Sequence, residues 1–353
     1  MNEPLHPLAL GETLDRTAQL YRSRFLVYLG IAVIPAGGMM FALAEIFGFV
    51  AWMGSWGATH LSNETGAALS VAAVVVLGIL AVSAYLGTSA LSWAAMSHAA
   101  ARAFLGEAIG IRDSYRSAWK HGWRYTWLYA LQIFFVVGIP AGGLLAAAWG
   151  IRLVQLAWPG AGVGEPASML RGMFLLVMVA LGGWMIWMLL RVCLAFPAAV
   201  VELSGAWRAL KRAATLSVGT RGRIFVMLLL GTALNWILAI GLSFPVMVVM
   251  SQLPESKNLH QSQMELIEIY LIYGLWFAVQ ALTKPVFGIA LTLFYFDQRI
   301  RKEGFDIEWA MQQAGMVTGP RALVMQSEAV MAVEGAAPGL ASIELAVPGV
   351  PPT

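Results

Sequence analysis

Residue types that carry out chemistry are few and scattered along this chain. Its five histidines are His6, His60, His98, His121 and His260, and none lies four residues from another with a glutamate between them, as in zinc proteases. The single cysteine, Cys193, excludes an intrachain disulfide and a multi-cysteine metal site. No glycine-rich phosphate-binding loop, paired acids or nucleophile with its base is visible. We therefore expect no catalytic residue, metal or cofactor, and a protein that is not an enzyme.

Three ionisable residues lie inside otherwise apolar segments. A charge at the bilayer centre costs about 2.5–3.5 kcal/mol on insertion scales, so such residues are the default functional candidates. Glu45 lies at the far end of its segment, and we expect it simply to end that segment. Arg191 and Lys284 lie deeper, and each precedes a proline that predicts a helix kink.

Two interpretations of Arg191 and Lys284 remain open. In the first, their long side chains extend along the helix and bring the charge to the inner membrane surface. In the second, they face a cavity at the kinks and bind an anionic headgroup or solute. No acidic residue lies at a matching depth in the apolar segments, which favours an external anion or the membrane surface over an internal ion pair.

The elements that position these residues must be membrane helices. Of the 353 residues, 59% are hydrophobic and only 12% are charged, and the mean hydropathy is +0.73. Soluble domains are about 25% charged, so this chain cannot cover the surface of a soluble protein of its size. Intrinsic disorder is excluded as well, because it accompanies low hydrophobicity. The composition indicates an integral membrane protein.

Six segments are long enough to cross a bilayer core of roughly 30 Å, which takes about 20 apolar residues. They cover residues 25–44, 67–101, 125–151, 172–201, 224–254 and 269–296. The predicted fold is all-α, a polytopic transmembrane helix bundle with six spans over residues 25–302. An amphipathic segment over residues 1–24 precedes it, and a flexible cytoplasmic tail over residues 303–353 follows. Within that tail, Asp306 is expected to cap a short helix that ends at Gln313.

The placement of basic residues predicts the orientation. Most of the 22 Lys and Arg residues lie before the first, third and fifth spans or after the second and sixth. Basic residues concentrate in cytoplasmic segments, so both termini are expected in the cytoplasm. The first 24 residues carry several charges and no signal-peptide pattern, so the first span should remain in the mature protein.

Three amphipathic segments with similar patterns precede the first, third and fifth spans. Their apolar faces begin at Leu10, Ile111 and Leu203, and each polar face carries charge. The chain therefore reads as three parallel units, each an interfacial helix plus a pair of spans. The basic stripes either serve topology alone or form a surface for lipid headgroups or a partner. The candidate contacts for headgroups are Arg112, Arg116, Lys120, Arg208, Lys211 and Arg212.

The two ends of this region resemble a known family. The opening Leu10-Gly-Glu-Thr-Leu-Asp-Arg16 with Tyr21, and the close Leu293-Phe-Tyr-Phe-Asp-Gln-Arg-Ile-Arg-Lys-Glu-Gly-Phe-Asp306, are similar to the ends of the glycerophosphoryl diester phosphodiesterase membrane-domain family. The matching positions are Gly11, Asp15, Arg16, Tyr21, Tyr295, Asp297, Arg299, Arg301, Glu303 and Gly304. The resemblance implies a stand-alone membrane domain without the catalytic phosphodiesterase barrel, and thus an architecture rather than an activity.

The expected function is that of a non-enzymatic membrane module that organises lipid or a partner protein at the inner face. The alternative is a transporter of a small or lipid-like anion that uses Arg191 and Lys284. The expected partners are membrane lipids, with anionic headgroups at the inner face, or a protein, and no nucleic acid. The expected location is the bacterial cytoplasmic (inner) membrane, as a multi-pass protein.

Overall fold

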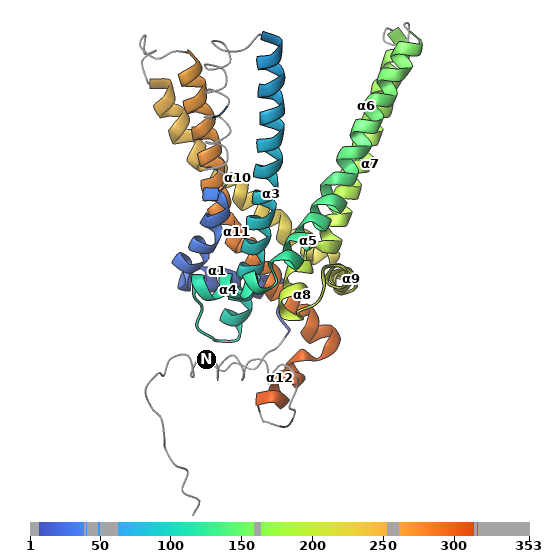
Figure 1. Ribbon diagram of the computed structural model, residues 1–353. Helices are drawn as coiled ribbons and strands as arrows, with labels where there is room; N and C mark the ends of the chain where they lie inside the picture. Colours follow the sequence, from blue (N-terminus) through green and yellow to red (C-terminus); the bar gives the residue numbers. More distant parts are fainter. Residues whose placement is uncertain are drawn as a thin grey trace, which may run out of the picture. The chain divides into compact units, whose positions relative to one another are not determined.

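The computed structural model describes residues 7–38, 40, 49, 63–158, 164–252, 261–313 and 316 (Figure 1). All regular structure within these ranges is helical, which confirms the predicted all-α fold. The chain forms two compact units by its internal contacts. The first covers residues 7–298, so the amphipathic segment at the N-terminus belongs to the same unit as the spans. The second begins at Arg299.

Five helical stretches are long and apolar enough to cross a membrane, so the protein is a multi-pass membrane protein. They cover Val71–Phe104, Gly122–Ala157, Ala167–Val201, Arg221–Val248 and Tyr270–Glu303. The helices that form them are α3 (Asn63–Phe104), α5 (Gly122–Ile133), the π-helix η1 (Phe134–Gly138), α6 (Ile139–Ala157), α7 (Gly164–Val192), α8 (Ala195–Val201), α10 (Arg221–Gln252) and α11 (Gln261–Glu303).

The predicted first span is described only in part. An apolar helix covers Phe25–Gly38, which is shorter than a full crossing. Most residues that would extend it, including Glu45, lie outside the described residues. Six spans therefore remains a prediction, while five are present by length and composition.

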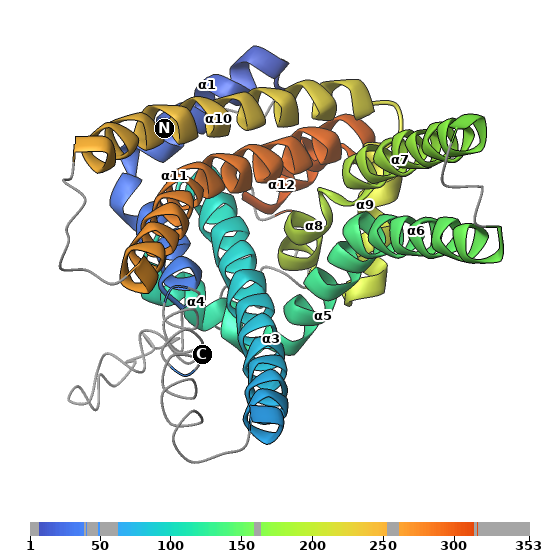
Figure 2. The same cartoon turned by 90° about the horizontal axis from the view of Figure 1, so that it is seen from above.

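The spans differ in how deeply they are buried. In the most apolar window of α11, 67% of the residues are buried inside the protein, against 11% or less for the other four spans. The outer faces of those four carry exposed Leu, Val and Ile side chains, as lipid-facing surfaces do. Figure 2 shows α11 between α10 and α3, and Lys284 on this helix is half-buried.

Three short helices lie where the amphipathic segments were predicted: α1 (Leu10–Ser23), α4 (Ile111–Lys120) and α9 (Ala206–Ser217). Two details of the prediction are wrong. Helix α9 begins at Ala206, so Leu203 lies outside it, exposed and with φ of 48°. A fourth short helix, α12 (Phe305–Gln313), begins one residue before Asp306, which lies in its first turn rather than at its cap.

Each of α1, α4 and α9 packs against the spans of another of the three predicted repeats. Helix α4 packs on α3, and the hydroxyl of Tyr115 donates to the carbonyl of Ile31 at 2.7 Å. Helix α9 packs on α5, α7 and α8. Helix α1 contacts α10, and the hydroxyl of Tyr21 donates to the carbonyl of Leu282 in α11 at 3.1 Å. The second predicted repeat thus packs on the first, the third on the second, and the first on the third, which closes a ring.

The last contact of this ring is polar and buried. Leu8 donates its backbone N–H to the Asp297 carboxylate at 2.9 Å, and its carbonyl accepts from Arg223 at 2.9 Å. Arg223 also pairs with Asp297 at 3.5 Å. One backbone residue ahead of α1 is therefore held at both its polar groups by α10 and α11.

Candidate functional site: a pocket inside the helix bundle

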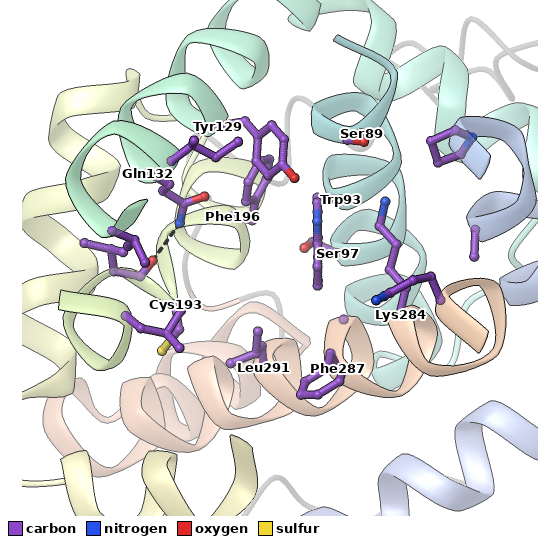
Figure 3. Close-up of a pocket in the computed structure, with 18 of the residues that line it drawn as sticks. Ser89, Trp93, Ser97, Tyr129, Gln132, Cys193, Phe196, Lys284, Phe287 and Leu291 are labelled. Carbon is purple, nitrogen blue, oxygen red and sulfur yellow. Dashed lines mark hydrogen bonds between the residues drawn. The ribbon is translucent and has the colours of Figure 1, made fainter. Parts of the chain in front are cut away.

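A pocket of about 510 Å³ lies within the first compact unit (Figure 3). Its walls come from the helix Phe25–Gly38 and from α3, α5, η1, α7, α8, α10 and α11, so all three predicted units contribute. Binding pockets for small molecules and cofactors have volumes of about 300–1,000 Å³. The pocket is large enough for a ligand of that class.

The walls are mostly apolar and aromatic, with a small number of polar groups. Figure 3 shows Ser89, Trp93, Ser97 and Lys284 on one side and Tyr129, Gln132, Cys193 and Phe196 on the other. Mostly hydrophobic walls with a few placed polar groups are typical of ligand sites, in which the polar groups fix orientation. Among the described residues that line the pocket, Lys284 is the only charged one.

Lys284 supplies the charge of the pocket. Its Nζ lies 5.3 Å from the centre of the Trp93 ring, and the side chain is half-buried. Among the described residues, Lys284 forms no hydrogen bond or ion pair. A cation over an aromatic face gains about 0.5–2 kcal/mol, which does not replace the hydration that the ammonium group loses. The pocket therefore offers an under-compensated positive charge within apolar walls.

Several spans are irregular where they line the pocket. Pro35, a lining residue, has no N–H for the carbonyl of Ile31, four residues earlier. That carbonyl accepts instead from Ser92 at 3.2 Å and from Tyr115 at 2.7 Å. Burial raises the pKa of Tyr115 to about 12, so its hydroxyl stays protonated and available as a donor.

Two further irregularities are completed in the same way. The π-helix η1 contributes Val136 and Val137 to the walls. Within it, the carbonyl of Phe135 accepts a hydrogen bond from the indole N–H of Trp184 at 3.3 Å. Gln132 donates to the carbonyl of Val192 at 2.8 Å, where α7 ends. The fourth irregularity is Pro285 inside α11, which has no N–H for the carbonyl of Ala281. Irregular backbone at membrane depth is tolerated where neighbouring groups satisfy it or where it lines a cavity, and π-bulges are frequent at functional sites.

The structure separates the two intramembrane cations that the sequence grouped together. Lys284 lines the pocket, as the cavity interpretation requires. Arg191 does not line it, and its guanidinium lies 5.2 Å from the centre of the Trp187 ring on α7. Arg191 and Lys284 therefore do not line one common path for a solute.

The predicted headgroup contacts fall into two groups. Arg112, Arg116 and Lys120 on α4, and Arg208 and Lys211 on α9, are exposed. Lys211 lies over the ring of Trp207, with its Nζ 5.9 Å from the ring centre. Arg212 differs, since its Nε donates to Glu202 at 2.8 Å. Arg212 thus takes part in an internal ion pair that the sequence did not predict.

The positions of the family resemblance are mostly structural. Tyr295 donates to Glu202 at 2.7 Å, which joins it to Arg212, and Asp297 holds Leu8. Gly304, with φ of 65°, makes the turn between α11 and α12. Of the other positions, Gly11, Asp15 and Arg301 are exposed. Arg16 pairs with Glu12, and Arg299 pairs with Glu303 and Glu308.

Sequence reasoning missed most of the pocket wall. Ser89, Trp93 and Ser97 follow one another at intervals of four residues, so they share one face of α3. Two small hydroxyl residues around a tryptophan, repeating at helical spacing inside an apolar span, were a usable signal. Gln132 and Tyr129 on α5 gave no comparable pattern, because one helical turn separates them and the residues between are apolar.

No protein-family model, curated protein or solved structure matches this chain. The resemblance to the phosphodiesterase membrane-domain family therefore stays a prediction. Any functional conclusion has to come from the site itself. Among the described residues, no group of three or more His, Cys, Asp or Glu side chains is placed to hold a metal ion.

Proposed function

We propose that the protein is a non-enzymatic membrane module that binds an anionic, lipid-like amphiphile in the pocket at Lys284. The observation that carries this proposal is the half-buried ammonium group of Lys284, which lacks an acidic partner among the described residues and lies within apolar walls. A bound anion would compensate the charge, and an alkyl chain would cover the aromatic and aliphatic surface.

The chemistry of the pocket narrows the ligand class. One lysine matches one negative charge at the head of the ligand, and Ser89, Ser97 and Gln280 are further polar groups in the walls. A small hydrated anion would gain little from Trp93, Phe196 and Phe287 and would lose its water. A long-chain carboxylate or a lipid phosphate satisfies both parts of the pocket.

Replacing Lys284 by methionine should weaken binding of oleate by about 10- to 150-fold. The variant removes a charge-assisted hydrogen bond worth about 1.5–3 kcal/mol while keeping a side chain of similar length. Binding to the purified protein in detergent is measured by fluorescence competition, with oleyl alcohol as the neutral ligand of the same chain length. Oleyl alcohol should bind both proteins equally.

Two further variants make this result specific. Lys284→Arg keeps the charge and should retain most of the oleate affinity. Arg152→Met removes an exposed cation of α6 that does not line the pocket, and should leave oleate binding unchanged. Equal oleate affinity in the wild type and Lys284→Met would refute the proposal, as would an equal loss in Arg152→Met.

Transport of such an anion is the second candidate function. It is favoured by the two helix breaks at the pocket, the π-helix η1 and the end of α7, because transporters often form their binding sites from discontinuous helices. Here Lys284 alone would contact the solute, since Arg191 lies outside the pocket. Counterflow of radiolabelled oleate into proteoliposomes separates a transporter from a module that only binds.

The membrane orientation is part of the same proposal. We infer a bacterial inner-membrane protein with both termini in the cytoplasm and with α4 and α9 against the inner surface, where their exposed cations meet anionic headgroups or a partner protein. A periplasm-active reporter fused at Gly162 should be active, and one fused at Gly219 should be inactive. The opposite pattern would reverse the orientation.

A further inference from the structure

Two arginines from different spans lie over one tryptophan ring. Arg191, in the last turn of α7, has its guanidinium carbon 5.2 Å from the centre of the Trp187 ring. Arg221, the first residue of α10, has its guanidinium carbon 5.8 Å from the same centre. None of these three residues lines the pocket at Lys284. They form a separate cluster, which we call the Trp187 cluster.

The cations of this cluster lack acidic partners. Within the described part of the chain, neither Arg191 nor Arg221 donates a hydrogen bond or forms an ion pair. The Nε of Arg221 is buried and has no acceptor among the described residues. Two like charges on one ring repel each other, and the ring itself compensates only part of that cost. An anion from outside the chain would compensate this charge.

The backbone at this point adds to the positive potential. Arg221 begins α10, whose first turn has N–H groups without helical acceptors and contains no acidic residue. Thr220, directly before it, directs its hydroxyl to the carbonyls of Leu216 and Ser217. An anion that binds Arg221 would also lie near the positive end of a 32-residue helix.

The surroundings indicate a lipid rather than a free ion. Trp184 and Trp187 are each 38% exposed and lie side by side on α7, and Ile186 of the same helix is exposed. Tryptophan is enriched at the membrane interface, where its ring lies at the headgroup level. A phosphate at the two arginines therefore has an apolar helix surface next to it for acyl chains.

We propose that Arg191, Arg221 and Trp187 form a second anion site, which binds the phosphate of an anionic phospholipid on the outside of the bundle. Guanidinium groups suit this role because they bind phosphate oxygens through paired N–H donors. The proposal does not depend on the pocket at Lys284, which takes its ligand between the helices and uses a lysine.

The test measures how much phosphatidylglycerol stays bound to each protein variant. Each variant is extracted in detergent from vesicles of phosphatidylcholine that contain a minor share of phosphatidylglycerol. Mass spectrometry counts the bound lipid of each class. Every protein carries Lys284→Met, so that the pocket cannot contribute an anion site. Arg191→Gln with Arg221→Gln should reduce phosphatidylglycerol retention by about tenfold and leave phosphatidylcholine unchanged. Arg171→Gln, an exposed arginine at the other end of α7, is the matched control and should change nothing.

Other outcomes are equally informative. Unchanged retention in the double variant, or the same loss in Arg171→Gln, would overturn the proposal. Displacement of phosphatidylglycerol by millimolar inorganic phosphate would assign the site to free phosphate and overturn the lipid assignment. If the double variant does not fold, Arg191→Lys and Arg221→Lys keep the charge but lose the paired donors, and should each lower retention while Arg171→Lys does not.

Discussion

Replacing Asp297 by alanine should lower the free energy of unfolding by about 3 kcal/mol. Asp297 is fully buried, and its carboxylate accepts from the Leu8 amide and the Gln298 side chain and pairs with Arg223. Breaking a buried ion pair from one side costs about 3–5 kcal/mol. The lower end applies because the Arg223 side chain is 30% exposed and can regain water. Thermal or denaturant unfolding in detergent measures the loss.

Hydrogen exchange at the Leu8 amide gives a local reading of the same change. The alanine variant should lose protection there, because the acceptor of that N–H is gone. Asp297→Asn keeps an acceptor oxygen and should lose less stability. Asp113→Asn, on the exposed surface of α4, is the control and should cost under about 1 kcal/mol. Full protection at Leu8 in Asp297→Ala would show that the contact does not hold the N-terminal segment.

Replacing Gly288 by alanine should destabilise the protein by about 1–3 kcal/mol and reduce binding in the pocket. A Cβ at this position would collide with the Cγ of Met96 on α3, whose side chain is fully buried. Overpacking of a well-packed interior costs about that much. Gly288 also lines the pocket, so the separation of α3 and α11 there bears on its shape. The same unfolding and oleate-binding measurements test both effects.

The helical environment provides a strict control for this substitution. In a helix, glycine to alanine is intrinsically favourable by about 1 kcal/mol. At Gly78 of α3 a new Cβ would meet nothing within 4 Å, so Gly78→Ala should be neutral or stabilising. Combining Gly288→Ala with Met96→Ala should cost less than the sum of the single changes, because the added methyl group fills part of the space left by methionine. Strict additivity would contradict the collision.

Much of the architecture could be predicted because membrane helices are encoded by local patterns. Long apolar runs predicted five described spans, and the amphipathic segments predicted α1, α4 and α9. The boundaries were less accurate, as at Leu203, where nothing in the periodicity distinguishes the last residue of a loop from the first turn of a helix.

Of the residues that line the candidate site, only Lys284 could be predicted from the sequence. Lys284 was singled out because a charge in an apolar span is conspicuous. Trp93, Gln132 and Phe196 are ordinary residues of such spans, and only the packing of separate helices brings them together around Lys284. Arg191 and Lys284 looked equivalent by depth, but one faces a cavity and the other a tryptophan and a second arginine. Depth is a property of the sequence, whereas the direction of a side chain depends on neighbours far away in it.

The ring of short helices also determines when the molecule can be completed during synthesis. Leu8 finds its acceptor 289 residues later, at Asp297. A ribosome that adds about 5–20 residues per second needs roughly 15–60 s to produce that partner. Throughout this interval the first helix has to wait at the membrane surface without its final neighbours. The protein therefore closes only when its last span has been inserted, and a chain interrupted before that point leaves its beginning, as well as its end, undocked.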